Sequence, residues 1–133
     1  MDNLTLKIEY LLKVLKKSWS LNSSSKWTMN NPAKGQCGVT ALVVNDIYGG
    51  EIFKTPTPEG WHFYNRINNK YFDLTESQFT SKIIYLNMPS SREEAFLDTN
   101  GIQYNALKQI VYSYLTDDSL PCRPSPSVKK GNL

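Results

Sequence analysis

The chain has 133 residues, a length typical of one domain and sufficient to bury a hydrophobic core without a metal or a disulfide framework. Its net charge is only +3, and much of the lysine excess lies at the two ends, whereas a nucleic-acid-binding domain has a clustered basic face. We therefore expect no nucleic-acid partner. The sequence has no apolar run long enough to span a bilayer and no signal-peptide pattern, so we expect a cytoplasmic protein with reduced thiols and no membrane partner.

The first half of the chain combines one clear helix, one loop and one run that is harder to assign. Residues 4–17 carry apolar residues at helical spacing, which predicts an amphipathic helix with Asn3 as its N-cap. Residues 18–34 are small and polar, apart from two tryptophans that we expect to anchor this loop to the core. Residues 39–48 are nearly all apolar. Their β-branched side chains suit a strand, but their length and the following Gly-Gly pair favour a buried helix.

After Gly50 the pattern predicts three short strands joined by tight turns, and therefore an antiparallel sheet. The predicted strands cover residues 51–54, 61–67 and 70–74, with turns at Pro56–Pro58 and at Asn68-Asn69. Thr75 and Gln78 then have the spacing of a capping box. Beyond them we expect an extended segment over 83–88, helices over 90–97 and 102–115, and a disordered tail rich in Pro and Ser over 117–133. Residues 1–116 then form a single α+β domain.

Three chemically active residues fall inside this patterned region, in the order Cys37, His62 and Asp73. A cysteine attacks as a thiolate, and its pKa is lowered by a helix N-terminus or by a neighbouring imidazolium. Cys37 lies where the buried helix should begin, and the flanking glycines leave backbone room for a substrate. His62, the only histidine, lies on the second predicted strand. We therefore predict a catalytic constellation of nucleophile, base and orienting acid.

The predicted hairpin provides a geometric reason for the pairing of His62 with Asp73. If the turn centres on Asn68-Asn69, the numbers of cross-strand partners sum to about 137, so that Asp73 is a diagonal neighbour of His62. The carboxylate can then hold one imidazole nitrogen while the other faces the thiol. Backbone N–H groups at the helix start are candidate oxyanion donors, with the Gln36 side chain as a second donor.

Other interpretations of these residues are structural. A lone cysteine in an apolar run is often a small buried hydrophobe, and a lone histidine on a strand is often a satisfied structural residue. A metal site is disfavoured because Cys37, His62, Asp73 and Cys122 include no closely spaced ligand pair, and we expect no cofactor.

Residues 26–79 resemble the YunG-like family of small bacterial proteins. The resemblance rests on Lys26-Trp27-Thr28, Asn31-Pro32, Gly35-Gln36-Cys37, 39–46, Gly49-Gly50, Ile52, His62, Tyr64-Asn65, Ile67, Asp73-Leu74-Thr75 and Gln78-Phe79. It implies little about activity.

More distantly, the order Cys, His, Asp resembles the papain-like superfamily, including its transglutaminase-type branch. This second resemblance implies a papain-like fold, in which the helix that bears the cysteine packs on a small antiparallel sheet. It also implies a nucleophile at Cys37, a general base at His62 and an orienting acid at Asp73. One departure is that Gln36 directly precedes the cysteine, whereas the oxyanion glutamine of papain lies several residues earlier.

Two functional hypotheses follow from these residues. The first is a thiol-dependent hydrolase, deamidase or acyl or amide transferase that acts on a small amide, ester or peptide, and it predicts a partly exposed, acidic Cys37. The alternative is a catalytically inactive binding module on the same fold, in which Trp27, Trp61 and Tyr64 hold a ligand or a partner. The distance between the Cys37 sulfur and a His62 nitrogen separates the two.

Overall fold

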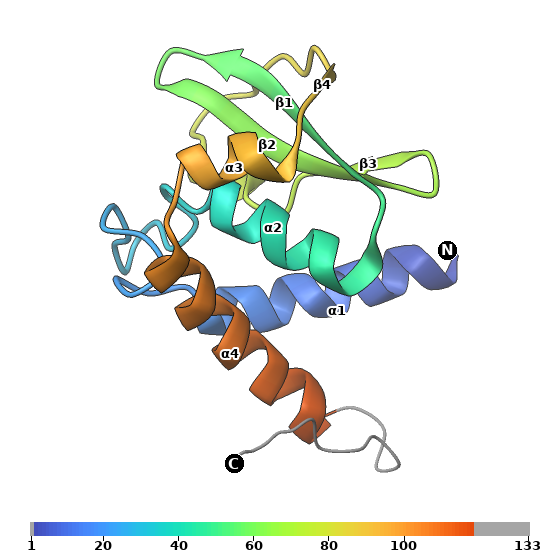
Figure 1. Ribbon diagram of the computed structural model, residues 1–133, viewed down its shortest axis with the longest axis vertical. Helices are drawn as coiled ribbons and strands as arrows, with labels where there is room; N and C mark the ends of the chain where they lie inside the picture. The colour runs from blue at the N-terminus through green and yellow to red at the C-terminus, as the bar shows by residue number, and fades with distance from the viewer. Residues whose placement is uncertain (1, 119–133) are drawn as a thin grey trace.

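Helix α2, Cys37–Tyr48, lies at the centre of the molecule, between a sheet and the two longest helices (Figure 1). The structure is a computed structural model, and it describes residues 2–118. The first eight residues of α2, Cys37–Val44, are all buried, which explains why this run carries apolar residues on every side. The helix ends at Gly49, whose φ of 74° favours glycine. The predicted buried helix is therefore confirmed.

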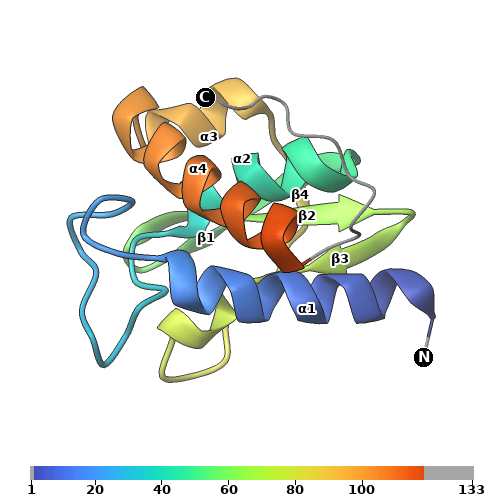
Figure 2. The ribbon, with the colours of Figure 1, turned by 90° about the horizontal axis from the view of Figure 1, so that it is seen from below.

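Two further helices cover the side of α2 that faces away from the sheet. They are α1, Asn3–Ser18, and α4, Gly101–Asp118, and Figure 2 shows both in front of the sheet. Their buried side chains, among them Leu11, Leu15, Leu107 and Val111, form one hydrophobic cluster with Val39 and Val43 of α2. Helix α4 includes the first two residues of the tail predicted over 117–133. The rest of that tail, with Cys122, lies outside the described residues.

The sheet has four antiparallel strands in the order β3-β2-β1-β4. They are β1 (Glu51–Thr57), β2 (Gly60–Ile67), β3 (Lys70–Phe72) and β4 (Met88–Pro89). Asn65 pairs with Phe72 and Ile67 with Lys70, so the predicted cross-strand sum of 137 is confirmed. Both turn residues, Asn68 and Asn69, have positive φ, as a two-residue hairpin turn requires. The prediction of an α+β domain with a small antiparallel sheet is confirmed.

Local details of three predictions are wrong. Strand β1 runs through Pro56 to Thr57, because β4 pairs only with Phe53 and Lys54 and leaves the edge beside Pro56 without a strand partner. The N-cap of α1 is Asp2, whose carboxylate accepts from the N–H of Thr5, in place of Asn3. The Thr75 side chain caps nothing, so the short 3-10 turn Glu76–Gln78 has no capping box.

Two buried hydrogen bonds hold α2 in position. The Trp19 indole N–H donates to Thr40 Oγ1 at 2.9 Å, so the predicted anchor of the loop is tied directly to the helix. From the sheet side, Asn65 Nδ2 donates to the carbonyl of Ala41 at 3.0 Å. Trp27 also packs against the core, although it is only partly buried. The start of α2 is thereby held against both the loop and β2.

The last side of α2 is covered by the short helix α3, Arg92–Leu97, whose N-cap is Ser91. At its far end, α3 passes so close to Gly38 that only a glycine fits there. An added Cβ would lie 2.6 Å from Asp98 Oδ2 and 2.9 Å from the carbonyl oxygen of Ala95. The corner between α3 and α4 is further held by ion pairs of Asp46 with Arg92 and Lys108.

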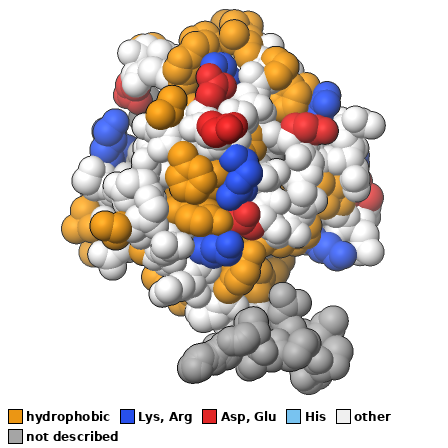
Figure 3. Space-filling model, viewed as in Figure 1, with side chains coloured by type: hydrophobic (Ala, Val, Ile, Leu, Met, Phe, Trp, Pro, Cys, Tyr) orange, Lys and Arg blue, Asp and Glu red, His pale blue; other side chains and the backbone are white. Residues whose placement is uncertain are grey.

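Acidic and basic side chains are interspersed on the face shown in Figure 3, with apolar side chains between them. Within the described residues, none of the helices has the length and apolarity needed to cross a membrane.

The close contact at Gly38 leads to a prediction about stability. Gly38→Ala should lower the free energy of unfolding by about 1–3 kcal/mol, because the overlap with α3 outweighs the better helix propensity of alanine. Gly101→Ala is the matched control: no atom lies within 4 Å of its added Cβ, so it should be neutral or stabilising by up to about 1 kcal/mol. Denaturant unfolding of both variants measures the difference, and equal effects would contradict this account of the corner.

Candidate active site

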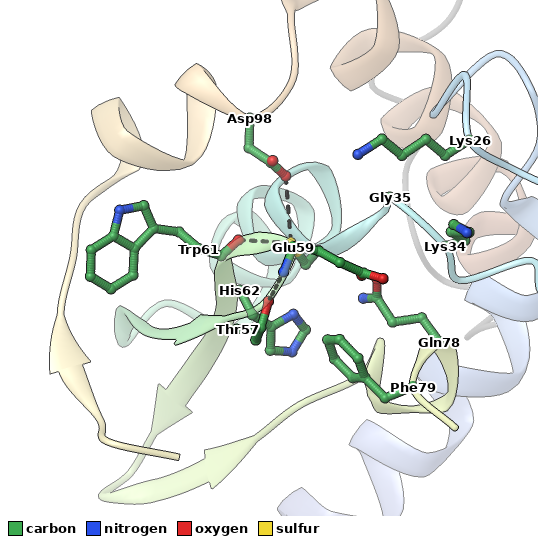
Figure 4. Close-up of a pocket in the computed structure, with 11 residues that line it drawn as sticks. Lys26, Lys34, Gly35, Thr57, Glu59, Trp61, His62, Gln78, Phe79 and Asp98 are labelled. Carbon is green, nitrogen blue, oxygen red and sulfur yellow. Dashed lines mark hydrogen bonds between the residues drawn. The ribbon is translucent and has the colours of Figure 1, made fainter. Parts of the chain in front are cut away.

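A cavity of about 420 Å³ opens at the N-terminal end of α2 (Figure 4). Its walls come from five places in the chain: the loop before α2, the start of α2, the β1–β2 hairpin, the segment after β3 and the corner between α3 and α4. The lining residues include Lys26, Lys34, Cys37, Thr57, Glu59, Trp61, His62, Gln78, Phe79 and Asp98. The structure therefore places Cys37 and His62 at one cavity, although 25 positions separate them in the sequence (62 − 37).

His62 and Asp73 are in direct contact. His62 Nε2 lies 2.7 Å from Asp73 Oδ2, and both side chains are almost fully removed from solvent. Because a carboxylate accepts hydrogen bonds, Nε2 donates, and in a neutral ring Nδ1 is then the basic nitrogen. The Phe79 ring packs edge-on against the imidazole, with centroids 4.8 Å apart, and so restricts its orientation. The contacts with Asp73 and Phe79 thus hold the imidazole of His62 in one orientation.

Both oxygens of the Asp73 carboxylate accept hydrogen bonds. Oδ2 also accepts from the hydroxyl of Tyr85 at 2.6 Å, and Oδ1 accepts from the N–H and the hydroxyl of Thr75. Burial and the neighbouring carboxylate raise the pKa of Tyr85, so its phenol stays protonated and remains a donor. Tyr85 was missed in the sequence because it lies in an irregular segment with no periodic pattern to place it.

The thiol of Cys37 lies against the backbone of β2 on either side of His62. Its sulfur is 4.0 Å from the carbonyl oxygen of Trp61, and it accepts from the N–H of Phe63. No hydrogen bond joins it to the imidazole: among the described residues, the buried His62 Nδ1 has no hydrogen-bond partner at all. The thiol instead donates to Asp98 Oδ2 at 3.4 Å.

Asp98, the C-cap of α3, was not predicted as a site residue. Its carboxylate turns inward and Oδ2 accepts from the thiol, as Figure 4 shows. The same oxygen also accepts from the backbone N–H of Gly38, at 3.0 Å. The space that Gly38 leaves is therefore filled by this side chain and not by solvent. No signal in the sequence marks this contact, because 61 positions separate Asp98 from Cys37.

The expected exposed, acidic cysteine is not what the structure shows. Cys37 is only 7% exposed, and burial is the main reason why the pKa of its thiol is raised. The charge of Asp98 raises this pKa further, against the opposing effect of the Phe63 N–H. Burial also raises the pKa of Asp98, although the thiol and the Gly38 N–H favour its ionised form. In this state Cys37 is a neutral thiol.

Of the other four predicted site residues, only Trp61 lines the cavity. Gln36 is fully buried and its amide points to the carbonyl of Ser20, away from the cavity. Neither Trp27 nor Tyr64 lines the cavity, and Tyr64 instead lines a different one together with Asp73 and Tyr85. Trp61 does line it, but its indole points outward in Figure 4, under the Lys54 ammonium at 4.2 Å.

Gln78, and not Gln36, is the glutamine whose side chain lines the cavity. Its Nε2 is buried without a hydrogen-bond partner among the described residues. A second cavity of about 520 Å³ adjoins the first and shares Lys34, Thr57, Glu59, Gln78 and Phe79 with it. The two together form a space that extends from the thiol towards residues 80–84. The described residues contain no group of three or more His, Cys, Asp or Glu side chains arranged to hold a metal ion.

The environment of the thiol leads to a prediction about pH. In a chain with Cys122→Ser, alkylation of Cys37 by iodoacetamide should rise at a higher pH than alkylation of free cysteine, because burial and Asp98 both disfavour the thiolate. Asp98→Asn removes the charge and should move this midpoint to lower pH. Glu59→Gln, which removes a charge from an exposed residue of the same cavity, is the control. An unchanged midpoint in Asp98→Asn would contradict the role given to Asp98.

Comparison with known proteins agrees with the resemblance noted in residues 26–79 and extends it. The family model described as YunG protein matches residues 7–116. The chain is 57% identical over 102 residues to the "Uncharacterized protein YunG" of Bacillus subtilis (strain 168), an alignment that covers 77% of this chain and 89% of that protein. No solved structure matches the chain significantly. The sequence, from the first helix through the last described one, thus identifies this protein as a member of the YunG family.

Proposed function

We propose that this protein is a thiol-dependent acyl enzyme, a hydrolase or an acyl or amide transferase, that acts on a small amide or ester. Cys37 is the nucleophile, His62 the general base and Asp73 the acid that orients the imidazole. The observation that carries the proposal is the state of His62. One ring nitrogen is held by Asp73 at 2.7 Å, while the other is buried, unpaired among the described residues and part of a ring that lines the cavity of the thiol.

An unpaired buried nitrogen has a cost that a purely structural histidine avoids. A buried acceptor without a partner loses about 1–3 kcal/mol of hydrogen bonding relative to water. The other nitrogen of His62 does have a partner, Asp73, and the carboxylate of Asp73 in turn accepts hydrogen bonds from Tyr85 and Thr75. Such a combination of a restrained ring and one unused nitrogen is what a general base requires.

The proposed reaction proceeds in two balanced steps. His62 Nδ1 takes the thiol proton, the sulfur attacks the acyl carbon, and the C–N or C–O bond breaks as the leaving group takes that proton. The product is a thioester on Cys37. Water or an amine then attacks the thioester, gives its proton to His62 and releases an acid or a new amide, while the thiolate regains a proton from His62. These steps use side chains of this chain together with water or an amine.

We also propose that the arrangement is papain-like. The cysteine is the first residue of a helix, and the histidine and the acid follow on strand β2 and directly after strand β3. The helix packs on the sheet that carries the histidine, which matches the order and elements expected of that superfamily. This support is an analogy at the level of the fold, so the reaction itself rests on the site.

The size of the cavities supports a small or short substrate. A volume of about 420 Å³ beside the thiol suits a compact acyl group, and the adjoining 520 Å³ can take a few further residues or a leaving group. Lys26 and Lys34 lie on the side opposite Trp61 in Figure 4. One end of a bound substrate would therefore lie near two positive charges, and the other end near Trp61.

A second candidate function is a binding module without catalysis. It is favoured by one observation, the protonated and carboxylate-bound thiol of Cys37. In that case the cavity holds a ligand but forms no bond with it.

Acylation of Cys37 by p-nitrophenyl acetate separates these two functions. In a chain with Cys122→Ser, the proposal predicts release of one nitrophenolate per chain and an acetyl group on Cys37, faster than acetylation of free cysteine at the same pH. His62→Ala should lower this rate by about 10²–10⁴-fold, the usual contribution of a general base. Stopped-flow absorbance and mass spectrometry of the intact chain provide the two readouts.

Cys37→Ser serves as the matched control for acetylation elsewhere on the chain. Because Asp98 holds the thiol in its protonated state, the same experiment is carried out on Asp98→Ala. Acetylation of Cys37 that is no faster than that of free cysteine in both proteins, or that does not depend on His62, would establish the binding module in place of the enzyme.

A further inference from the structure

The start of α2 already binds an oxygen in this structure, and that oxygen belongs to the protein itself. Asp98 Oδ2 lies 3.0 Å from the Gly38 nitrogen and 3.4 Å from the Cys37 sulfur. The first N–H groups of a helix have no partner within the helix and carry partial positive charge, so they bind anionic oxygens well. Asp98 occupies one such N–H immediately beside the nucleophile.

This position coincides with what the proposed reaction needs. When a thiol attacks an acyl carbon, the acyl oxygen gains negative charge next to the sulfur and is stabilised by donors about 2.7–3.1 Å away. The Gly38 N–H meets that requirement for an oxygen located where Asp98 Oδ2 now lies. His62, whose buried Nδ1 has no hydrogen-bond partner among the described residues, lines the same cavity, so the proposed base is present while the oxygen position is filled.

Asp98 can leave this position without unfolding the protein. The residue lies on the corner between α3 and α4 and is exposed to solvent, although its carboxylate turns inward. A side chain on an exposed residue can change rotamer without movement of the backbone, and such a change would break only the two contacts with Cys37 and Gly38. The other charged groups at the cavity are Lys26, Lys34 and Glu59, and Lys26 is the lysine whose charge favours the ionised form of Asp98.

We propose that the Gly38 N–H is the acyl-oxygen subsite, that Asp98 fills it in the ligand-free protein, and that a substrate's acyl oxygen or a product's carboxylate replaces Asp98 there. Asp98 is then a gating residue of the site. The ligand class is a small carboxylate or acyl compound. The assignment of this subsite to catalysis rests on the proposed function, whereas the exchange of one carboxylate for another at Gly38 does not.

Acetate provides a direct probe of that exchange. In ¹⁵N-labelled full-length protein with Cys122→Ser and Asp98→Ala, acetate should shift the Gly38 amide signal and slow alkylation of Cys37 by iodoacetamide. At an acetate concentration ten times its Kd, competition should lower the alkylation rate about tenfold. In the chain that retains Asp98, the same concentration should have a much smaller effect on both readouts, because acetate must first displace Asp98; ionic strength is held constant by sodium chloride.

Two control variants separate occupancy from charge. Asp98→Asn keeps an oxygen of similar reach, so it should still fill the subsite and exclude acetate, although the negative charge is gone. Glu59→Ala removes a charge from the same cavity but leaves Asp98 on Gly38, so it should also exclude acetate. Should Asp98→Ala fail to give a native spectrum, Asp98→Gly, which has no side chain and suits the end of a helix, takes its place.

The outcomes distinguish this proposal from the previous one. An unshifted Gly38 amide in Asp98→Ala or Asp98→Gly, or equal acetate binding by Asp98→Asn, would overturn the subsite. A shifted Gly38 amide in a chain whose Cys37 is never acetylated would support the subsite and reject the enzyme. Acetylation of Cys37 with no acetate effect on Gly38 would support the enzyme and reject the gate.

Discussion

The burial of α2 on all sides is the constraint on which the rest of the structure depends. A helix whose first eight residues are all buried needs a separate structure against each face. The sheet covers one side, α1 and α4 cover another, and α3 closes the remaining space over Gly38. The consequence for chemistry is that the N-terminal end of the helix, with Cys37, is held where the loop, the hairpin and the α3–α4 corner meet. The cavity is the gap that these three leave.

At that cavity, the thiol of Cys37 has two potential proton acceptors, a carboxylate and an imidazole. Asp98 binds the thiol in its neutral form, which a nearby negative charge favours. His62 Nδ1, which has no hydrogen-bond partner among the described residues, is the second acceptor in the role that we propose for it. A raised thiol pKa in the ligand-free protein is therefore compatible with a reactive cysteine, provided that ligand binding changes which of the two acceptors is close to the sulfur.

The sequence allowed the local parts of the site to be predicted, but not its long-range parts. Asn68-Asn69 and the alternation around it determined the hairpin register, and with it the contact between His62 and Asp73. The Gly-Gly stop identified α2 as a helix and put Cys37 at its start. In contrast, the side chain of Gln36 was turned away by packing against the Ser20 loop. Asp98 and Tyr85 reach the site through tertiary contacts that no spacing in the sequence encodes.

The contacts of the site also differ in how far apart their residues are in the sequence, and we expect the short-range contact to form before the long-range one. His62 and Asp73 are 11 positions apart and share one hairpin, so closing their contact costs little chain entropy. Asp98 follows Cys37 by 61 positions, and its contact waits for α3 to dock. During synthesis, which proceeds from the N-terminus, the imidazole and its carboxylate can meet before the residue that covers the helix start has been added. Until that residue arrives, a nascent chain would hold a cysteine and a base with no carboxylate over the thiol.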